Sequence, residues 1–249
     1  MIETNIKTCK ILGVNIAAVN MNSLLEFITS NLSRLKGEYI CVSNVHTTVM
    51  AYDNKDYLNV QNSSLLSIPD GGPLSSVGRK RGFSEMQRTT GPDFLDEILT
   101  ISVEKKYRHY FYGSTEDTLK KMQTKIKEKY GDVYIVGMYS PPFRNLTNEE
   151  DDQIIKDINN INPDFVWVGL GAPKQENWMY EHKNRINALM VGVGAAFDYM
   201  AGNISRAPKW MQKLNLEWLY RLMQDPIRLF SRYLYTNTKF LINAVLLKR

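Results

Sequence analysis

Polar and glycine residues follow five of the predicted strands, at the positions where α/β proteins place the groups that bind and react. They are Asn44, Asp70-Gly71-Gly72, Gly113-Ser114, the segment 171–176 and the segment 192–198. In an open α/β sheet, ligands bind in the crevice beyond the carboxyl ends of the strands. The sequence therefore predicts that these five places contribute to a ligand site.

Asp70 has two interpretations. It follows the apolar stretch 65–69 and precedes two glycines and a proline, and a Pro-Asp-Gly turn is common without any function. Alternatively, a carboxylate held at the mouth of a strand can take a proton from an attacking hydroxyl. The position at a strand end favours the functional interpretation, and the residues alone leave both open.

The segment 171–176 offers the backbone N–H groups of a helix start, which suit an anion, and Lys174 adds a positive charge. A strand-to-helix turn with a solvent-facing lysine is the alternative. Neither this segment nor 192–198 completes the glycine fingerprint of dinucleotide-binding proteins, because Lys174 and Phe197 occupy the third glycine position. The sequence also lacks a Walker A motif. These departures weigh against a nicotinamide dehydrogenase.

The residue pattern gives little support to metal chemistry. The three histidines, His46, His109 and His182, are isolated and suit structural roles better than metal binding. No Asp-x-Asp occurs to hold a divalent cation on a diphosphate. If a diphosphate leaves during the reaction, arginines must balance its charge. The candidates are Arg88, Arg206, Arg221, Arg228 and Arg232, of which the last two are spaced to share one helix face.

Short apolar stretches alternate with longer amphipathic ones, which is typical of βαβ units around a mainly parallel sheet. The predicted strands are 11–19, 39–43, 65–69, 108–112, 133–136, 165–169 and 189–193. The predicted helices are 22–35, 47–60, 93–106, 116–130, 149–160 and 174–185, and Thr147 with Glu150 forms a capping box for the fifth. We predict an α/β fold with a Rossmann-like, mainly parallel sheet flanked by helices.

The pattern becomes helical after Gly202. Ala207-Pro208 opens a stretch rich in Trp, Leu and Met, and Asp225-Pro226 predicts the N-cap and first residue of a further helix. We therefore predict an α/β body over residues 1–204 and a basic, amphipathic helical appendage over residues 205–249. A chain that ends near Asp225 is expected to keep a folded body.

The net charge of +5 is concentrated in residues 205–249, which hold nine Lys and Arg against two acids and include seven aromatic residues. Basic and aromatic side chains that interleave suit a bilayer interface, although a solvated helix face or single-stranded nucleic acid is also compatible with them. No apolar run approaches the roughly 18–20 residues of a spanning helix. The polar N-terminus and two cysteines predict a cytoplasmic protein.

Several motifs together resemble the WecG/TagA/CpsF family of bacterial glycosyltransferases, glycosyltransferase family 26. The matching pieces are Pro69-Asp70-Gly71, Arg88-x-x-Gly91-x-Asp93, Gly171-Ala172-Pro173-Lys174-Gln175-Glu176, Gly194-Ala195-x-Phe197-Asp198, Ala201-Gly202, Arg206-Ala207-Pro208 and Glu217-Trp218-Leu219-Tyr220-Arg221-Leu222. Their order and spacing extend over about residues 10–235. Each piece alone is weak, and together they are highly specific.

The resemblance implies an inverting, metal-independent transfer of a sugar from a UDP-sugar to an undecaprenyl-diphosphate-linked saccharide. It implies no cofactor and no nucleic acid, a peripheral position on the inner face of the cell membrane, and a role in capsule, teichoic acid or other cell-surface polysaccharide biosynthesis. The donors that fit are UDP-N-acetylmannosamine, its uronic acid or a UDP-hexose. The sequence leaves a homo-oligomer open.

The resemblance also implies roles for individual residues. Asp70 would be the general base and Asn44 would lie in the sugar site. The acceptor diphosphate would bind Arg221, Arg228 and Arg232. The remaining substrate contacts would be Arg88, Gly91, Asp93, Gly113, Gly171, Lys174, Gln175, Glu176, Asp198 and Arg206. This chain departs from the family at Val42-Ser43-Asn44, where members often have Thr-Pro-Asn, and at Ser231, where some members have a further arginine.

Two rivals to this function remain at this stage. A nucleotide-dependent oxidoreductase or epimerase uses the same kind of sheet but needs the complete glycine fingerprint. A non-catalytic membrane adaptor would explain the basic tail but gives no role to Asp70 or to the segment 171–176.

Overall fold

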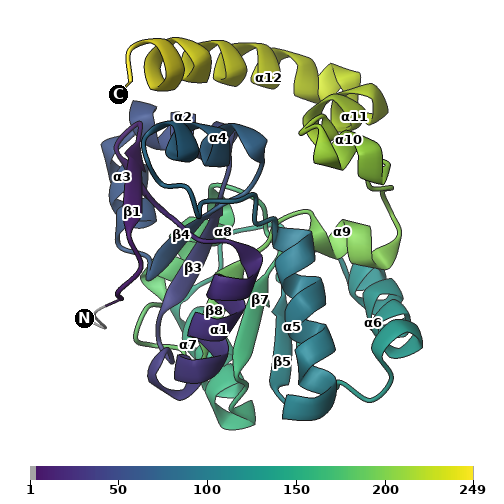
Figure 1. Ribbon diagram of the computed structural model, residues 1–249. Coiled ribbons are helices and arrows are strands. Elements are labelled where there is room, and N and C mark those ends of the chain that lie inside the picture. Colours follow the sequence, from purple (N-terminus) through teal and green to yellow (C-terminus); the bar gives the residue numbers. More distant parts are fainter. Residues whose placement is uncertain (1–3, 249) are drawn as a thin grey trace. The chain divides into compact units, whose positions relative to one another are not determined.

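The computed structural model describes residues 4–248 and has the predicted α/β architecture, with one mainly parallel sheet of eight strands flanked by helices (Figure 1). The strand order is β1-β2-β4-β3-β8-β7-β5-β6. The strands are β1 (Thr8–Ile11), β2 (Val14–Ala17), β3 (Tyr39–Ser43), β4 (Leu66–Pro69), β5 (Arg108–Tyr112), β6 (Tyr134–Tyr139), β7 (Phe165–Val168) and β8 (Leu189–Gly192). Only the β1–β2 pair among the described pairings is antiparallel.

The helices fall into two groups along the chain. The first nine are α1 (Met21–Asn31), α2 (Val45–Asp53), α3 (Lys55–Asn62), α4 (Gly72–Lys80), α5 (Gly91–Lys105), α6 (Glu116–Tyr130), α7 (Asn148–Ile161), α8 (Lys174–Glu181) and α9 (Ala196–Ala201), with a short 3-10 turn, η1 (Leu32–Arg34), after α1. The last are α10 (Lys209–Lys213), α11 (Glu217–Gln224), α12 (Pro226–Phe240) and a π-helical turn, η2 (Leu241–Leu246). Residues 209–246 are therefore almost entirely helical, as the sequence predicts.

The chain folds into two compact units, each assembled from separate stretches of sequence. Unit 1 contains residues 22–41 and 91–204, and unit 2 contains residues 4–21, 42–90 and 205–249. The predicted division into 1–204 and 205–249 shares the border near residue 205 with these units. Membrane docking by residues 205–249 stays a prediction.

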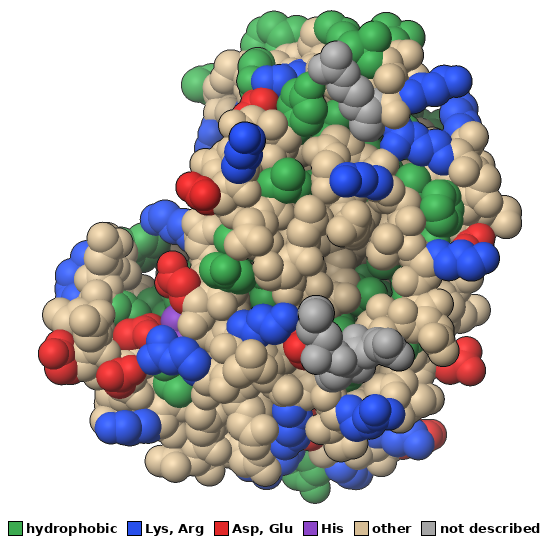
Figure 2. All heavy atoms as spheres, turned by 90° about the vertical axis from the view of Figure 1, so that its left-hand side faces the viewer, with side chains coloured by type: hydrophobic (Ala, Val, Ile, Leu, Met, Phe, Trp, Pro, Cys, Tyr) green, Lys and Arg blue, Asp and Glu red, His purple; other side chains and the backbone are tan. Residues whose placement is uncertain are grey.

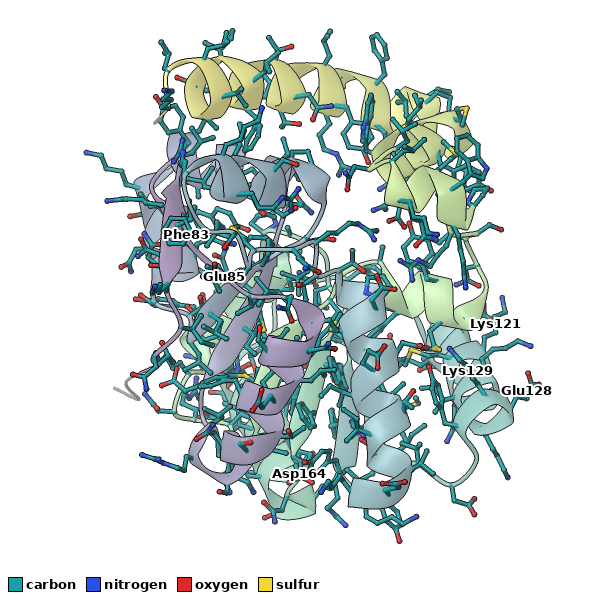
Figure 3. The ribbon with its side chains drawn as sticks, in the orientation of Figure 1. Phe83, Glu85, Lys121, Glu128, Lys129 and Asp164 are labelled. Carbon is teal, nitrogen blue, oxygen red and sulfur yellow. The ribbon has the colours of Figure 1, made fainter. Side chains whose placement is uncertain are left out.

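Unit 1 is built on β5 to β8, whose buried aromatic side chains form much of its core. On one face Trp167 stacks with His109, and its indole N–H donates to His109 Nδ1 at 3.1 Å. Burial lowers the pKa of His109 to about 3, so this ring is neutral and structural. At the amino-terminal end of the strands, the carboxylate of Asp164 accepts the backbone N–H of Arg108 at 2.9 Å and joins the starts of β5 and β7 (Figure 3).

Unit 2 has its own core, to which the C-terminal helices contribute. One stripe of α12 and η2, made of Leu229, Thr236, Phe240 and Ala244, is buried. Phe240 and Ala244 belong to the same apolar cluster as Ile11 of β1. A chain that ends near Asp225 would lose these side chains from the core, and the expectation that it keeps a folded body stays a prediction.

Two predicted elements are divided in the structure. The predicted strand 11–19 is a hairpin, because Leu12 and Gly13 turn the chain with φ values of 50° and 90°. The predicted helix 47–60 is two helices, because Asn54 ends α2 and its side chain caps α3 by accepting the N–H of Tyr57 at 3.0 Å. The helices α4 and α9 are additions that the sequence analysis did not predict.

The predicted helix starts are confirmed at two places. The Thr147 and Glu150 side chains form the reciprocal capping box at the start of α7. Asp225 caps α12 through its side chain, and Pro226 occupies the first turn. Among residues 4–248 no helix is both long enough and apolar enough to cross a membrane.

Candidate active site

Asp70 directly follows β4, and the backbone around it is fixed on both sides. Its N–H donates to the carbonyl of Ser43 at 2.7 Å, and the carbonyl of Pro69 accepts the N–H of Thr89 at 2.8 Å. Gly71 has a φ of 101° and begins the turn into α4, a conformation that side chains rarely adopt. The Pro-Asp-Gly sequence is thus a turn and also holds a carboxylate at a strand end, so the two interpretations of Asp70 are compatible.

The charge state of Asp70 is set by burial against a group of charged residues. Burial raises the pKa of Asp70 to about 6, Arg88 and Arg221 oppose this rise, and the negative charge of Glu217 adds to it. A carboxyl group with a pKa near 6 is largely ionised at neutral pH and is still basic enough to accept a proton. This is the property that a general base requires.

Asn44 lies next to Asp70, as the sequence analysis expects of two site residues. It follows β3 and caps α2, where its side chain accepts the N–H of Thr47 at 3.1 Å. The Asn44 side chain also hydrogen-bonds to Asp70, which favours the ionised carboxylate. The neighbouring Ser43 hydroxyl is buried and donates to Gln61 Oε1 at 2.7 Å. Ser43 is therefore committed to the interior and does not present its hydroxyl beside Asp70.

Glu217 of α11 gathers the arginines that accompany Asp70. Its carboxylate forms an ion pair with Arg88 and lies 3.5 Å from Nε of Arg206, and all three side chains are mostly buried. The sequence analysis placed Glu217 in a family motif but gave it no site role. Its position as one of two acids in a strongly basic tail is the signal that could have identified it.

The three arginines predicted for the acceptor diphosphate are in different surroundings. Arg221 is close enough to Asp70 to lower its pKa. Arg228 is exposed and pairs with Asp225 at 2.5 Å. Arg232 lies over the ring of Tyr233. The pKa of His46 is lowered to about 4, mainly because His46 is buried and also because of the positive charge of Arg232. The structure thus brings Asn44, Asp70, Arg88, Arg206 and Arg221 together around Glu217, while Arg228 and Arg232 have other described neighbours.

The predicted site residues of unit 1 form a second group, which Gln175 organises. Its Oε1 accepts the N–H groups of Gly171 and Gly194, each at 3.1 Å, and its Nε2 donates to Glu176 at 2.8 Å. Gln175 and Glu176 are buried. The loops after β7 and β8 are therefore held together by one carboxamide, which shapes both of the predicted glycine segments.

The other predicted residues of unit 1 lie around these loops. Gly113 follows β5 with a φ of 113°, and a side chain there would meet the backbone of Gly169. Gly91 begins α5, with Asp93 in its first turn, and Lys174 is exposed at the start of α8. Asp198 accepts a hydrogen bond from Asn203 at 3.1 Å. Within residues 4–248, no group of three or more His, Cys, Asp or Glu is arranged to hold a metal ion.

Replacing the partly buried carboxylate of Asp70 should stabilise the protein in a pH-dependent way. Because the folded pKa of Asp70 is raised to about 6 from 3.8, proton binding favours the folded state at low pH, and this contribution is lost as the pH rises through 6. The side chain of Asp70→Asn is neutral at every pH. The difference in unfolding free energy between this variant and wild type should therefore grow by about 1–3 kcal/mol in favour of the variant from pH 4 to pH 8. Urea unfolding at both pH values measures this, and an equal effect at the two would contradict it.

Comparisons with known proteins find similarity over most of the chain. The family model described as "Glycosyl transferase WecG/TagA/CpsF family" matches residues 9–249. An N-acetylglucosaminyldiphosphoundecaprenol N-acetyl-beta-D-mannosaminyltransferase of Bacillus subtilis (strain 168) is 34% identical over 86% of this chain and 83% of its own length. Proteins with the same name from Bacillus spizizenii and from Staphylococcus aureus (strain MW2) are 31% and 27% identical, over 80% and 90% of this chain and 76% and 87% of their own lengths.

Proposed function

This chain belongs to the WecG/TagA/CpsF family of glycosyltransferases, and from that premise we propose that it transfers a sugar from a UDP-sugar to an undecaprenyl-diphosphate-linked saccharide. The observation that carries the proposal is Asp70, a partly buried carboxylate with a pKa of about 6 beside Arg88 and Arg221. The product would enter cell-wall polymer biosynthesis, such as that of teichoic acid.

The proposed reaction is a single displacement. Asp70 takes the proton from an acceptor hydroxyl while that oxygen attacks the anomeric carbon of the donor sugar. The bond between this carbon and the UDP oxygen breaks, UDP leaves with the bonding electron pair, and the configuration at the carbon inverts. A single carboxylate base is enough for this step, because no covalent sugar–enzyme intermediate is formed.

The names of the relatives favour one donor among those that fit the family. Each is an N-acetyl-mannosaminyltransferase that acts on N-acetylglucosaminyldiphosphoundecaprenol. We propose UDP-N-acetylmannosamine as the donor to test first, followed by its uronic acid and UDP-hexoses. Where family members often have Thr-Pro-Asn, this chain has Val42-Ser43-Asn44. The buried hydroxyl of Ser43 donates to Gln61, so this part of the proposed sugar site differs from the family pattern.

We propose that arginines rather than a metal ion balance the charge of the phosphates. Arg88, Arg206 and Arg221 gather around Glu217 and Asp70, and guanidinium groups bind phosphate through charge-assisted hydrogen bonds. Within this group three positive charges face two negative ones, so an added anion is attracted.

The C-terminal helices supply a surface that suits a bilayer. On α12 and η2 a second stripe, Ile227, Phe230, Leu234 and Leu241, follows helical spacing and is exposed, with Ile227 95% exposed. Figure 2 shows apolar side chains gathered at the top of the molecule, where α12 lies. With lysines and arginines beside it, this stripe supports peripheral docking on the inner face of the cell membrane.

The first prediction from this function concerns Asp70. Asp70→Asn should keep UDP binding and lower the turnover by about 10²–10⁴-fold, because the base is lost. Release of UDP in the presence of the donor and a short-chain polyprenyl-diphosphate-linked acceptor measures turnover. In wild type, kcat/KM should fall as the pH drops through about 6, since protonated Asp70 cannot accept a proton. Turnover of Asp70→Asn within a few-fold of wild type would exclude this base.

A second prediction concerns metal dependence. If arginines hold the phosphates, the initial rate in the UDP-release assay should be unchanged by EDTA. A loss of activity that magnesium or manganese restores would show that a metal ion supports the departure of UDP.

A third prediction concerns the exposed stripe. The triple variant Ile227→Ser/Phe230→Ser/Leu234→Ser should keep its fold and largely lose sedimentation with anionic phosphatidylglycerol vesicles, because the apolar area that enters the interface is removed. Phe143→Ser is the matched control, since Phe143 is 92% exposed in unit 1. Equal vesicle binding by the triple variant and wild type would refute docking through this stripe.

A further inference from the structure

Two buried side-chain nitrogens on α2 and α12 lack a hydrogen-bond partner. They are Nδ1 of His46 and Nε of Arg232, and neither is paired with any group in residues 4–248. Folded proteins rarely leave buried polar atoms unpaired, so such atoms indicate a water or ligand that the protein binds. Neither residue belongs to the group that gathers around Glu217, so the site described above leaves both unexplained.

The packing of the two helices brings these side chains together. The helix α12 lies along α2 (Figure 1), and at the end of α2 the carboxylate of Asp53 binds Lys239 and Tyr235. His46 lies about two turns before Asp53 on α2. Arg232 lies about two turns before Lys239 on α12. The two helices therefore run side by side in the same direction, and the charge of Arg232 acts on the His46 ring.

The pair lies near the surface of unit 2. As whole residues His46 and Arg232 are only partly buried. The guanidinium of Arg232 rests on the ring of Tyr233, with Cζ 5.9 Å or less from the ring centre at 5.3 Å, and Trp218 packs edge-on against the same ring at 6.0 Å. A small movement of the long Arg232 side chain along this aromatic surface is enough to open the two nitrogens to a ligand.

The pair is also close in sequence to the base. Asn44 caps α2 and its side chain hydrogen-bonds to Asp70. His46 is in the first turn of the same helix. A ligand group held by His46 and Arg232 would therefore lie at the end of α2 that adjoins Asp70.

The chemistry of the pair suits a hydroxyl group better than a phosphate. His46 is neutral, because burial and the positive charge of Arg232 lower its pKa to about 4. A neutral imidazole accepts a hydrogen bond through one nitrogen, and the nearby cation favours the lone pair on Nδ1. Nε of Arg232 can only donate. A hydroxyl group donates to the first and accepts from the second, whereas an ionised phosphate oxygen has no hydrogen to donate.

We propose that His46 and Arg232 bind one hydroxyl group of a substrate saccharide and so contribute to the choice of sugar. The inference rests on the proposed function, which supplies two saccharides, one on UDP and one on the lipid diphosphate. Arg232 then recognises a sugar and not the diphosphate that the family resemblance implies for it.

Direct binding to the full-length protein tests the pair with ligands that differ only in the sugar. One set is UDP-N-acetylmannosamine and UDP, and the other is farnesyl-diphospho-N-acetylglucosamine and farnesyl diphosphate. In titration calorimetry, His46→Phe and Arg232→Met should each bind the sugar-bearing member of one set about 10-fold or more weakly than wild type does. Both variants should bind the two sugar-free ligands as wild type does. The set that is affected identifies the saccharide.

Three further variants show whether both residues hold the same hydroxyl. His46→Phe/Arg232→Met should lose less affinity than the product of the two single losses, because the residues share one ligand group. His46→Asn keeps a hydrogen-bond acceptor near the position of Nδ1 and should retain part of the affinity. Lys55→Gln, which removes an exposed cation at the start of α3, is the control and should bind all four ligands as wild type does.

Several outcomes would overturn the proposal. If wild type gains no affinity from either sugar, or if His46→Phe and Arg232→Met lose stability in urea but bind all four ligands normally, the nitrogens hold only a structural water. If binding of UDP or farnesyl diphosphate falls as much as that of its sugar-bearing counterpart, Arg232 binds phosphate. If the sugar-dependent differences appear and no sugar is transferred, the pair stands and the proposed reaction is the part that fails.

Discussion

The ion pairs of Glu217 hold two arginines of unit 2 beside the partly buried carboxylate of Asp70. Arg88 and Arg206 approach this one carboxylate from different parts of the chain. Without it, two partly buried guanidinium groups would lie close together with less compensating charge, which is costly in a low-dielectric environment. Glu217 also raises the pKa of Asp70, while the arginines that it gathers lower it. The balance leaves the pKa of the Asp70 carboxyl group near 6, so the group is neither a permanent anion nor a neutral acid.

This balance connects stability with chemistry. A carboxylate that is buried and only partly compensated destabilises the folded state at neutral pH, and the same incomplete compensation keeps it basic. The backbone supplies the rigidity that such a group needs, because Asp70 and Pro69 are each tied to a neighbouring segment. In unit 1 the carboxamide of Gln175 has a comparable organising role without a charge, since it joins two glycine loops through their N–H groups.

Much of this arrangement could be predicted from local sequence. The alternation of apolar and amphipathic stretches gave the α/β class, and the position after a strand identified both Asn44 and Asp70. The helix α4 was missed because its sequence contains two glycines, Gly72 and Gly78, which usually disfavour a helix. The structure explains them, since Asn215 and Met86 leave no room for a Cβ at these positions. Such close approaches, like the pairing of Glu217 with Arg88, join residues far apart in sequence and leave no local pattern.

The two stripes of α12 have a consequence for how this protein can diverge. One stripe completes the core of unit 2 with Phe240, and the other exposes Ile227 and Phe230. Tyr235 and Lys239 also bind Asp53 at the end of α2, so a third part of the helix circumference is occupied. Because α12 contacts the rest of unit 2 on several sides, it cannot be exchanged for the corresponding helix of a relative without other changes. We therefore expect substitutions at its inward-facing positions to need matching changes in α2 and β1.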